Sequence, residues 1–269
     1  PWAPPPEAIQ AAQAAASEST THSYCADDGI PELKDALKKK LLSDNKLKES
    51  EVMVCSGSNQ AYGNVVVALL DPGDAAVLFT PYYFNHHMAL QMNGARIVYG
   101  ATDPTTLLPD LVWLRARLSD SSQPKVKMVT LVNPGNPSGV TIPWDMLKEA
   151  SEVCREAGAW LVVDNAYEYF TYEASGDGPP HSCLEGGHVV NTFSFSKTYG
   201  MMGWRVGYLA YPARIKDALM KVQDTIPICP PVLSQRLALA ILQKGGGSLI
   251  RDKVSGLVAS KRQMEGVIE

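Results

Sequence analysis

Short apolar runs alternate along the chain with longer stretches in which apolar residues recur at helical spacing. The apolar runs cover residues 52–55, 75–79, 95–99, 126–132, 159–164 and 188–195, and the helical stretches between them cover 58–70, 84–93, 109–118 and 143–158. Strands that are apolar on both faces and alternate with helices are typical of a parallel sheet covered by helices on both sides. The pattern therefore predicts an α/β fold with a mostly parallel central sheet flanked by helices.

The two ends of the chain have a different pattern. The first eight residues are rich in proline and predict an extended arm, and the alanine-rich residues 7–19 predict a helix. Residues 31–42 place leucines at helical spacing after a proline, which indicates a surface helix with one apolar face. Residues 245–248 are glycine-rich and predict a connection before a last helix.

Composition and charge exclude several classes of protein. The 269 residues include 24 Lys and Arg against 28 Asp and Glu, a net charge of −4, so no excess of positive charge is available to bind nucleic acid. Hydrophobic residues make up 45% and charged residues 19%, which suits a globular protein with a large core. The longest uncharged stretch, residues 52–70, contains too many polar residues for a membrane helix.

The cysteines and histidines give no sign of a metal site. The five cysteines are widely spaced and form no C-x-x-C pair, which argues against a disulfide framework and against zinc. We therefore expect a reducing compartment, the cytoplasm. His86 and His87 are adjacent, but no cysteine or carboxylate stands at ligand spacing from them, so we expect them on a helix surface and not at a metal.

Residues that bind phosphate, stack on rings or titrate follow directly after the apolar runs. In an open α/β sheet the ligand site lies beyond the carboxyl ends of the strands, so these residues are the candidates for chemistry. They are SGSNQ at residues 56–60, TPYY at 80–83, NPGNPSG at 133–139, DNAY at 164–167 and SFSK at 194–197. We expect these five loops to meet at one edge of the sheet.

Two of these side chains suit covalent and proton chemistry. A lysine at a strand end in a cleft, such as Lys197, can lose its proton through desolvation and become a nucleophile toward an aldehyde. Asp164 ends an apolar run and brings to the sheet edge a carboxylate that needs a cationic partner. Taken alone, Lys197 also fits an ordinary surface lysine, and Asp164 also fits the N-cap of the following turn.

A second group of residues suits an anion such as phosphate. Ser58 and Asn59 open a predicted helix directly after a glycine, where unpaired backbone N–H groups and the helix dipole attract negative charge. Two hydroxyls and one guanidinium, from Ser194, Ser196 and Arg205, can add hydrogen bonds to the same anion.

The order and spacing of these residues resemble those of one enzyme family. Lys197 with Arg205 eight residues later, preceded by DNAY and NPGNPSG, resembles the pyridoxal-phosphate site of class I/II (fold-type I) aminotransferases. The resemblance covers essentially the whole chain, since residues 23–37 are similar to the family's tyrosine-bearing loop and helix, and residues 56–61 to its phosphate-binding turn. It implies the large domain of a fold-type I enzyme with pyridoxal 5′-phosphate as cofactor.

The resemblance also implies a role for each candidate. Lys197, Asp164 and Tyr167 would be catalytic: Lys197 attaches to the cofactor aldehyde and moves protons, and Asp164 pairs with the pyridine nitrogen. Asn136 and Tyr167 would donate hydrogen bonds to the cofactor 3′-oxygen, and Tyr83 would stack on the ring. The phosphate ligands would be Ser58, Asn59, Ser194, Ser196 and Arg205. Tyr24 would reach the phosphate of a neighbouring subunit, which implies a homodimer.

The implied activity is transfer of an amino group between an amino acid and a 2-oxo acid by a ping-pong mechanism. The runs at residues 82–95, 133–139, 164–170 and 193–208 look most like plant-type aromatic aminotransferases that use methionine as amino donor. Two alternatives share nearly all the residues named above. One is a pyridoxal-phosphate-dependent lyase of the same fold, either aminocyclopropane-carboxylate synthase-like or a carbon–sulfur lyase, and the other is a truncated, non-catalytic form that binds the cofactor.

The resemblance divides the chain into three parts. Residues 1–30 correspond to an N-terminal arm and partner-contacting loop, 31–245 to the cofactor-binding large domain, and 246–269 to the start of a truncated C-terminal region. In the family, a small C-terminal domain supplies an arginine for the substrate carboxylate, and a glycine-bearing segment before residue 1 also lines the site. We expect the 269-residue chain alone to bind cofactor more readily than it turns over, because substrate orientation depends on that arginine.

Two unrelated enzyme classes fit less well. SFSK also satisfies the S-x-x-K pattern of serine β-lactamases, but SDN at residues 43–45 lies upstream of it and no K-T-G is present. The chain after SFSK is also expected to be glycine- and proline-punctuated connection. No G-x-G-x-x-G follows the first apolar run, which argues against a nicotinamide-binding fold.

Overall fold

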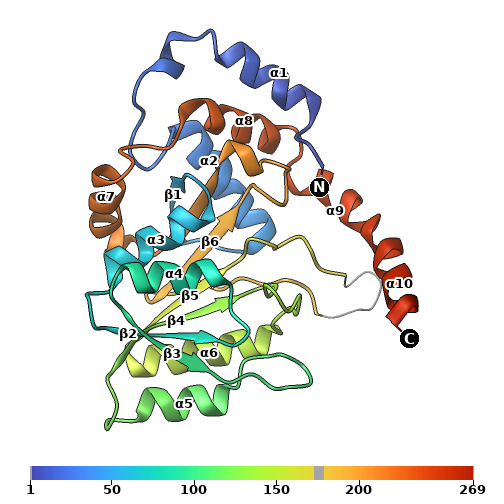
Figure 1. Ribbon diagram of the computed structural model, residues 1–269. Coiled ribbons are helices and arrows are strands. Elements are labelled where there is room, and N and C mark those ends of the chain that lie inside the picture. Colours follow the sequence, from blue (N-terminus) through green and yellow to red (C-terminus); the bar gives the residue numbers. More distant parts are fainter. Residues whose placement is uncertain (1, 173–178, 269) are drawn as a thin grey trace.

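A seven-stranded sheet with the order β1-β7-β6-β5-β4-β2-β3 runs through the centre of the computed structural model, which describes residues 2–172 and 179–268 (Figure 1). The strands are β1 (Glu51–Cys55), β2 (Ala75–Phe79), β3 (Arg96–Gly100), β4 (Val126–Val132), β5 (Trp160–Asp164), β6 (Val189–Ser194) and β7 (Gly207–Tyr211). Strands β2 to β6 pair in parallel, and β7 runs antiparallel to both of its neighbours, β1 and β6. The predicted mostly parallel α/β fold is confirmed.

Helices cover both faces of this sheet. They are α1 (Pro6–Ala15), α2 (Pro31–Lys40), α3 (Ser58–Leu69), α4 (Phe84–Met92), α5 (Leu111–Ser119), α6 (Trp144–Ala157), α7 (Lys216–Thr225), α8 (Val232–Gln243), α9 (Gly247–Ser255) and α10 (Leu257–Ile268). Apolar residues of α3, α4 and α7 form the core on one face, while those of α5 and α6, and of α1, α2 and α8, form two cores on the other. Within the described residues, no helix is long and apolar enough to cross a membrane.

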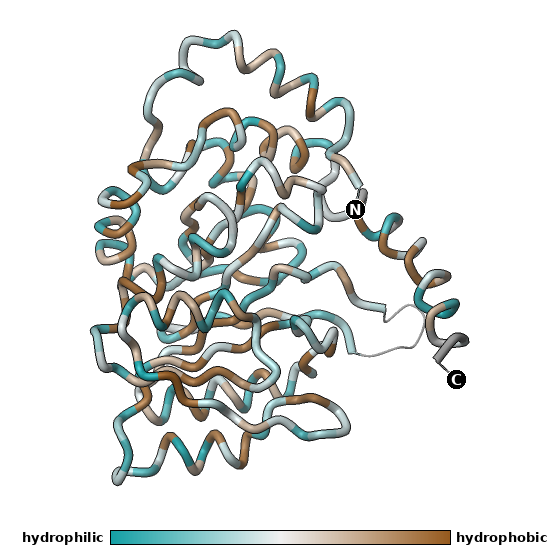
Figure 2. Tube along the Cα trace, in the orientation of Figure 1, coloured by the Kyte–Doolittle hydropathy of each residue, from teal (hydrophilic) through white to brown (hydrophobic). Residues whose placement is uncertain are grey.

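Alternation of side chains along each strand supplies all three cores. On β7, Tyr208 and Ala210 point to the core beneath α2 and α8, whereas Leu209 and Tyr211 point to the core beneath α3 and α7. Successive side chains of a strand point to opposite faces, so a strand covered on both faces is apolar throughout. Figure 2 shows the result, with hydrophobic residues concentrated in the central strands.

The end of the chain departs from the prediction in two places. Strand β7 and helices α7 and α8 occupy the part that was expected to be connection, and this expectation is wrong. The five residues of β7 are all buried, but the run is short and lies close to a loop rich in glycine. The glycine-rich residues 245–248 are only partly a connection, because Gly247 already opens α9.

Helix α2 buries its leucines as the spacing predicts, but its last residue is not on the surface. Leu33 and Leu37 are fully buried, and Lys40 is only 8% exposed. The Lys40 ammonium donates hydrogen bonds to the carboxylate of Glu168 and to the side-chain oxygen of Asn45, and it lies 4.8 Å from the centroid of the Phe193 ring. A buried charge needs such partners, and here they tie α2 to the segment after β5 and to β6.

The sheet register brings the predicted chemical loops together. Gly207 pairs with Cys55 of β1 and with Ser194 of β6. Asp164 at the end of β5 pairs with Val132 at the end of β4. Strands β1, β4, β5 and β6 run in the same direction, so their carboxyl ends lie at one edge of the sheet, together with the start of β7. The loops that follow these four strands meet at that edge.

Gly207 permits the closest approach at this edge. A Cβ on Gly207 would lie 2.5 Å from the Ser58 backbone nitrogen and 2.6 Å from the Gly57 carbonyl carbon. We expect Gly207→Ala to lower the free energy of unfolding by about 1–3 kcal/mol, as overpacking against rigid backbone does. Gly63→Ala is the matched control, because a Cβ at Gly63 in α3 meets nothing within 4 Å and should stabilise the helix by roughly 0.5–1 kcal/mol. Chemical denaturation checks both values, and equal stability of the two variants would contradict the expectation.

Candidate active site

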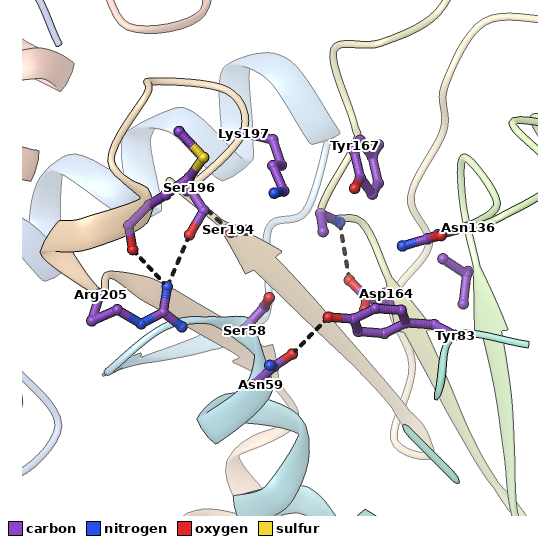
Figure 3. Close-up of a pocket in the computed structure, with 13 residues that line it drawn as sticks. Ser58, Asn59, Tyr83, Asn136, Asp164, Tyr167, Ser194, Ser196, Lys197 and Arg205 are labelled. Atoms are coloured by element: carbon purple, nitrogen blue, oxygen red, sulfur yellow. Dashed lines mark hydrogen bonds between the residues drawn. The ribbon is translucent and has the colours of Figure 1, made fainter. Parts of the chain in front are cut away.

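A cleft with about 620 Å³ of empty volume lies at this edge of the sheet (Figure 3). Its lining includes every residue that the sequence predicted for a cofactor held by a single subunit: Ser58, Asn59, Tyr83, Asn136, Asp164, Tyr167, Ser194, Ser196, Lys197 and Arg205. Val132, Ala166 and Met202 complete the wall. Tyr24 is not part of this lining, and its side chain is 80% exposed.

One end of the cleft is built to hold an anion. Helix α3 begins at Ser58, and Gly57 before it has a φ of 90° and no side chain to cap the first N–H groups. The Arg205 guanidinium lies against this turn, since a Cβ on Gly57 would come within 2.4 Å of its Nη2 atom. Arg205 Nη1 donates to the Met202 carbonyl at 2.9 Å and to the Ser196 hydroxyl at 3.4 Å. Positive charge, hydroxyls and open N–H groups thus face one space.

Lys197 stands beside this anion-binding end. It follows the end of β6, its side chain is exposed, and Figure 3 shows its amine directed into the cleft. Within the described residues, the Lys197 amine has neither a hydrogen bond nor an ion pair. The expected desolvation of Lys197 is therefore not found in this structure, but no neighbour prevents the amine from reaching an electrophile that enters the cleft.

The opposite end of the cleft holds a carboxylate. Asp164 is only 4% exposed, and its Oδ1 atom accepts a hydrogen bond from the Ala166 backbone N–H at 3.0 Å. Its Oδ2 atom lies 2.9 Å from Nε2 of His86, which is 2% exposed. The His86 ring lies between Tyr62, at 4.0 Å between centroids, and Tyr83, whose ring meets it edge-on at 5.2 Å. Asp164 is therefore buried, oriented and hydrogen-bonded.

The contact of His86 with Asp164 is one that the sequence did not predict. The expectation that His86 lies on a helix surface is wrong, because it is buried against Asp164. His86 stands three residues after Tyr83 in the first turn of α4, and residues at this spacing share one helix face. Since Tyr83 was already predicted to face the site, that spacing was the available signal. His87 is half-buried elsewhere, stacked on Tyr82 and hydrogen-bonded to the Tyr99 hydroxyl.

Two neutral hydrogen-bonding groups lie between the ends of the cleft. The side chains of Asn136 and Tyr167 are half-buried, and neither makes a hydrogen bond with another described residue. Burial raises the pKa of the Tyr167 phenol, and Tyr83 and the Asp164 carboxylate raise it further. The phenol therefore keeps its proton at neutral pH and can donate it in a hydrogen bond to a ligand.

The residues present fit pyridoxal 5′-phosphate. Its phosphate matches the anion-binding end formed by Arg205 and the start of α3, and its pyridine nitrogen matches the Asp164 carboxylate. Lys197 supplies an amine for its aldehyde, while Asn136 and Tyr167 supply donors for its hydroxyl oxygen.

Comparison with known proteins gives the same family. The family model for aminotransferase class I and II matches residues 2–257. An aromatic aminotransferase of Arabidopsis thaliana, ISS1, is 48% identical over 100% of this chain and 68% of its own length. An aspartate/prephenate aminotransferase of Thermus thermophilus is 29% identical over 88% of this chain and 61% of its own length. The chain belongs to the class I and II aminotransferases, which depend on pyridoxal phosphate.

Solved structures agree with this assignment. A tetra mutant of the aspartate aminotransferase from Thermus thermophilus superposes with a TM-score of 0.89 and 25% sequence identity. The match covers 99% of this chain and 73% of that one. The mostly parallel seven-stranded sheet with its flanking helices is thus the fold of the fold-type I aminotransferases.

The contact between His86 and Asp164 can be tested by substitution. His86→Phe keeps a ring between Tyr62 and Tyr83 but leaves Asp164 with the Ala166 N–H as its remaining partner. We expect the free energy of unfolding of the cofactor-free protein to fall by about 1–3 kcal/mol, the typical penalty for a buried polar group that loses its partner. His87→Phe, which does not touch Asp164, is the control. Denaturant titration of both variants measures these free energies. If His87→Phe lost as much free energy of unfolding as His86→Phe, the contact between His86 and Asp164 would not be the cause of the loss.

Proposed function

We propose that the protein containing this chain transfers amino groups between an amino acid and a 2-oxo acid, with pyridoxal phosphate as cofactor. The observation that carries the proposal is the free Lys197 amine in a cleft between a buried carboxylate and an anion-binding helix start. The cation at one end of the cleft matches the phosphate of this cofactor, and the carboxylate at the other end matches its pyridine nitrogen. The amine between them matches its aldehyde.

An aromatic amino acid, with methionine as an alternative donor, is the proposed substrate. Support for the aromatic class comes from the 48% identity with the Arabidopsis aromatic aminotransferase, which extends over the whole chain. Methionine rests on the resemblance of the site loops to plant-type enzymes that use it. The chain spans 61–68% of the two curated relatives described above, so these substrates concern the whole protein.

The residues of the cleft divide the work. When bound, the cofactor supplies an aldehyde and an electron-withdrawing ring. Arg205 and the start of α3 hold its phosphate, and Asp164, oriented by His86, keeps the ring nitrogen protonated. Lys197 would supply the amine that attaches the cofactor through its aldehyde, with loss of water, and once displaced by the substrate amine it would be free to carry a proton to and from the substrate α-carbon. Tyr167, whose phenol pKa is raised by burial, would donate a hydrogen bond to the cofactor hydroxyl oxygen beside Lys197.

Substitution of the lysine tests this function. In the full-length protein, Lys197→Ala should abolish the visible absorption band of lysine-bound cofactor and lower kcat by at least about 10³-fold, since it removes both nucleophile and proton carrier. Lys148→Ala, on the exposed face of α6, should leave both unchanged. A persisting band with cofactor still covalently attached would exclude Lys197 as the attachment site. The product distinguishes the alternatives, because a lyase releases ammonia or closes a ring in the product, whereas an aminotransferase yields a keto acid and leaves the amino group on the cofactor.

A homodimer is the proposed active form, with Tyr24 completing the partner's site. The support is that Tyr24 lies outside its own cleft with its side chain 80% exposed, together with the resemblance of its loop to the family's partner-contacting loop. A two-fold dimer makes such an exchange reciprocal. We also propose the cytoplasm as the location, in line with the five free cysteines.

Mixed dimers test the exchange of Tyr24. Lys197→Ala and Tyr24→Ala each impair both sites of their own homodimers. In a mixed dimer, both defects fall in one site and the other site is intact, so random reassembly of equal amounts should restore about a quarter of the wild-type sites. Each parent preparation, carried separately through the same reassembly, is the control. Activity equal to the average of the two parents would show that Tyr24 serves its own subunit or neither.

A further inference from the structure

The N-terminal arm makes a specific contact with the loop that carries Lys197. The indole Nε1 of Trp2 donates a hydrogen bond to the backbone carbonyl of Thr198 at 2.8 Å. Thr198 is the residue directly after Lys197. The arm predicted from the proline-rich start of the chain therefore lies against the loop that presents the reactive amine.

The same loop is shaped to accept the backbone of the arm. Gly200 has a φ of 68°, a conformation that favours glycine. A Cβ at Gly200 would also lie only 2.1 Å from the Trp2 carbonyl oxygen. The loop thus has two contacts with Trp2 within three residues of Lys197, one through the indole and one through the backbone.

The Trp2 ring also reaches the turn that carries Tyr167. It stacks on Phe170, with 5.9 Å between ring centroids and planes within 5° of parallel. Phe170 in turn meets the Tyr167 ring edge-on at 5.7 Å, and its backbone N–H donates to the Tyr167 carbonyl at 2.8 Å. Three rings in contact therefore lead from the arm to the phenol in the cleft.

Helix α9 adds a further contact to Trp2. The ammonium of Lys253 lies 5.5 Å from the centroid of the indole ring, an arrangement that attracts a cation to the ring face. Trp2 is half-buried among these contacts. A side chain held at this many points has little freedom to change its rotamer.

We propose that Trp2 is a positioning residue that holds the Lys197 loop and the Tyr167 turn in register. The two loops follow different strands, β6 and β5, and among the described residues no hydrogen bond joins the Lys197 and Tyr167 side chains to each other. Trp2 contacts both, so it fixes the direction from which the amine and the phenol face a common ligand. Proton transfer depends steeply on such geometry. This role rests on the proposed function, whereas the contacts themselves do not.

Amide hydrogen exchange of the cofactor-free, full-length protein tests the positioning role directly. Trp2→Phe removes the hydrogen bond to Thr198 but keeps a ring to stack on Phe170. Phe170→Leu removes the ring stacking but keeps the hydrogen bond from Trp2 to Thr198. We expect Trp2→Phe to accelerate exchange in residues 196–204 by roughly fivefold, the factor that matches one hydrogen bond, and to leave residues 166–172 unchanged. Phe170→Leu should accelerate exchange in residues 166–172 only. Trp144→Phe, at the start of α6, is the control and should affect neither segment.

The kinetics of the cofactor-loaded protein give a second measurement. Trp2→Phe should lower kcat about threefold to tenfold with KM changed less than twofold, as expected when reacting groups are misaligned but binding is retained. The proposal is overturned if the exchange rates of residues 196–204 are the same in Trp2→Phe as in Trp144→Phe. It is also overturned if Trp2→Phe raises exchange uniformly across the protein. Because exchange is measured without cofactor, it decides the role of Trp2 even if the wild-type protein proves not to be an aminotransferase.

Discussion

The site depends on the close approach of three backbone segments at one edge of the sheet. Gly207 of β7 pairs with β1 on one side and with β6 on the other. Because Gly207 has no side chain, the start of α3 packs directly on it. This places the uncapped N–H groups of α3 beside the hydroxyls at the end of β6. Arg205, two residues before Gly207, then lies over the same space. The anion-binding end is thus a product of backbone packing, to which a few side chains add charge.

The cleft separates opposite charges in a fixed arrangement. The Arg205 guanidinium lies at one end and the Asp164 carboxylate at the other, with the Lys197 amine facing the space between them. Asp164 is held by His86 and the Ala166 N–H before any ligand arrives. Groups that are oriented in advance stabilise charge on a ligand without reorganising when it binds. The rigid sheet beneath them is what maintains the arrangement.

The sequence predicted the parts of this architecture that depend on local pattern. Residues such as Asp164 and Ser194 end apolar runs, so strand direction alone brings them to one edge, and the structure places them in one cleft. The contact of His86 is harder to predict because its partner is 78 residues away, and the spacing from Tyr83 indicates only which way His86 faces, not that it is buried against Asp164. Trp2 was read as part of a proline-rich arm for the same reason, since Thr198 and Phe170 are distant in sequence. Strand β7 was missed because five apolar residues near a glycine-rich loop give no clear period.

The buried pair of Lys40 and Glu168 has a consequence for heat resistance. Both side chains are nearly inaccessible to water, and they join α2 to the segment that bears Tyr167. The hydration of charged groups becomes less favourable as temperature rises, so the penalty for keeping this pair out of water shrinks on warming. The contribution of this pair to the junction between α2 and the segment that bears Tyr167 therefore becomes relatively more favourable on warming.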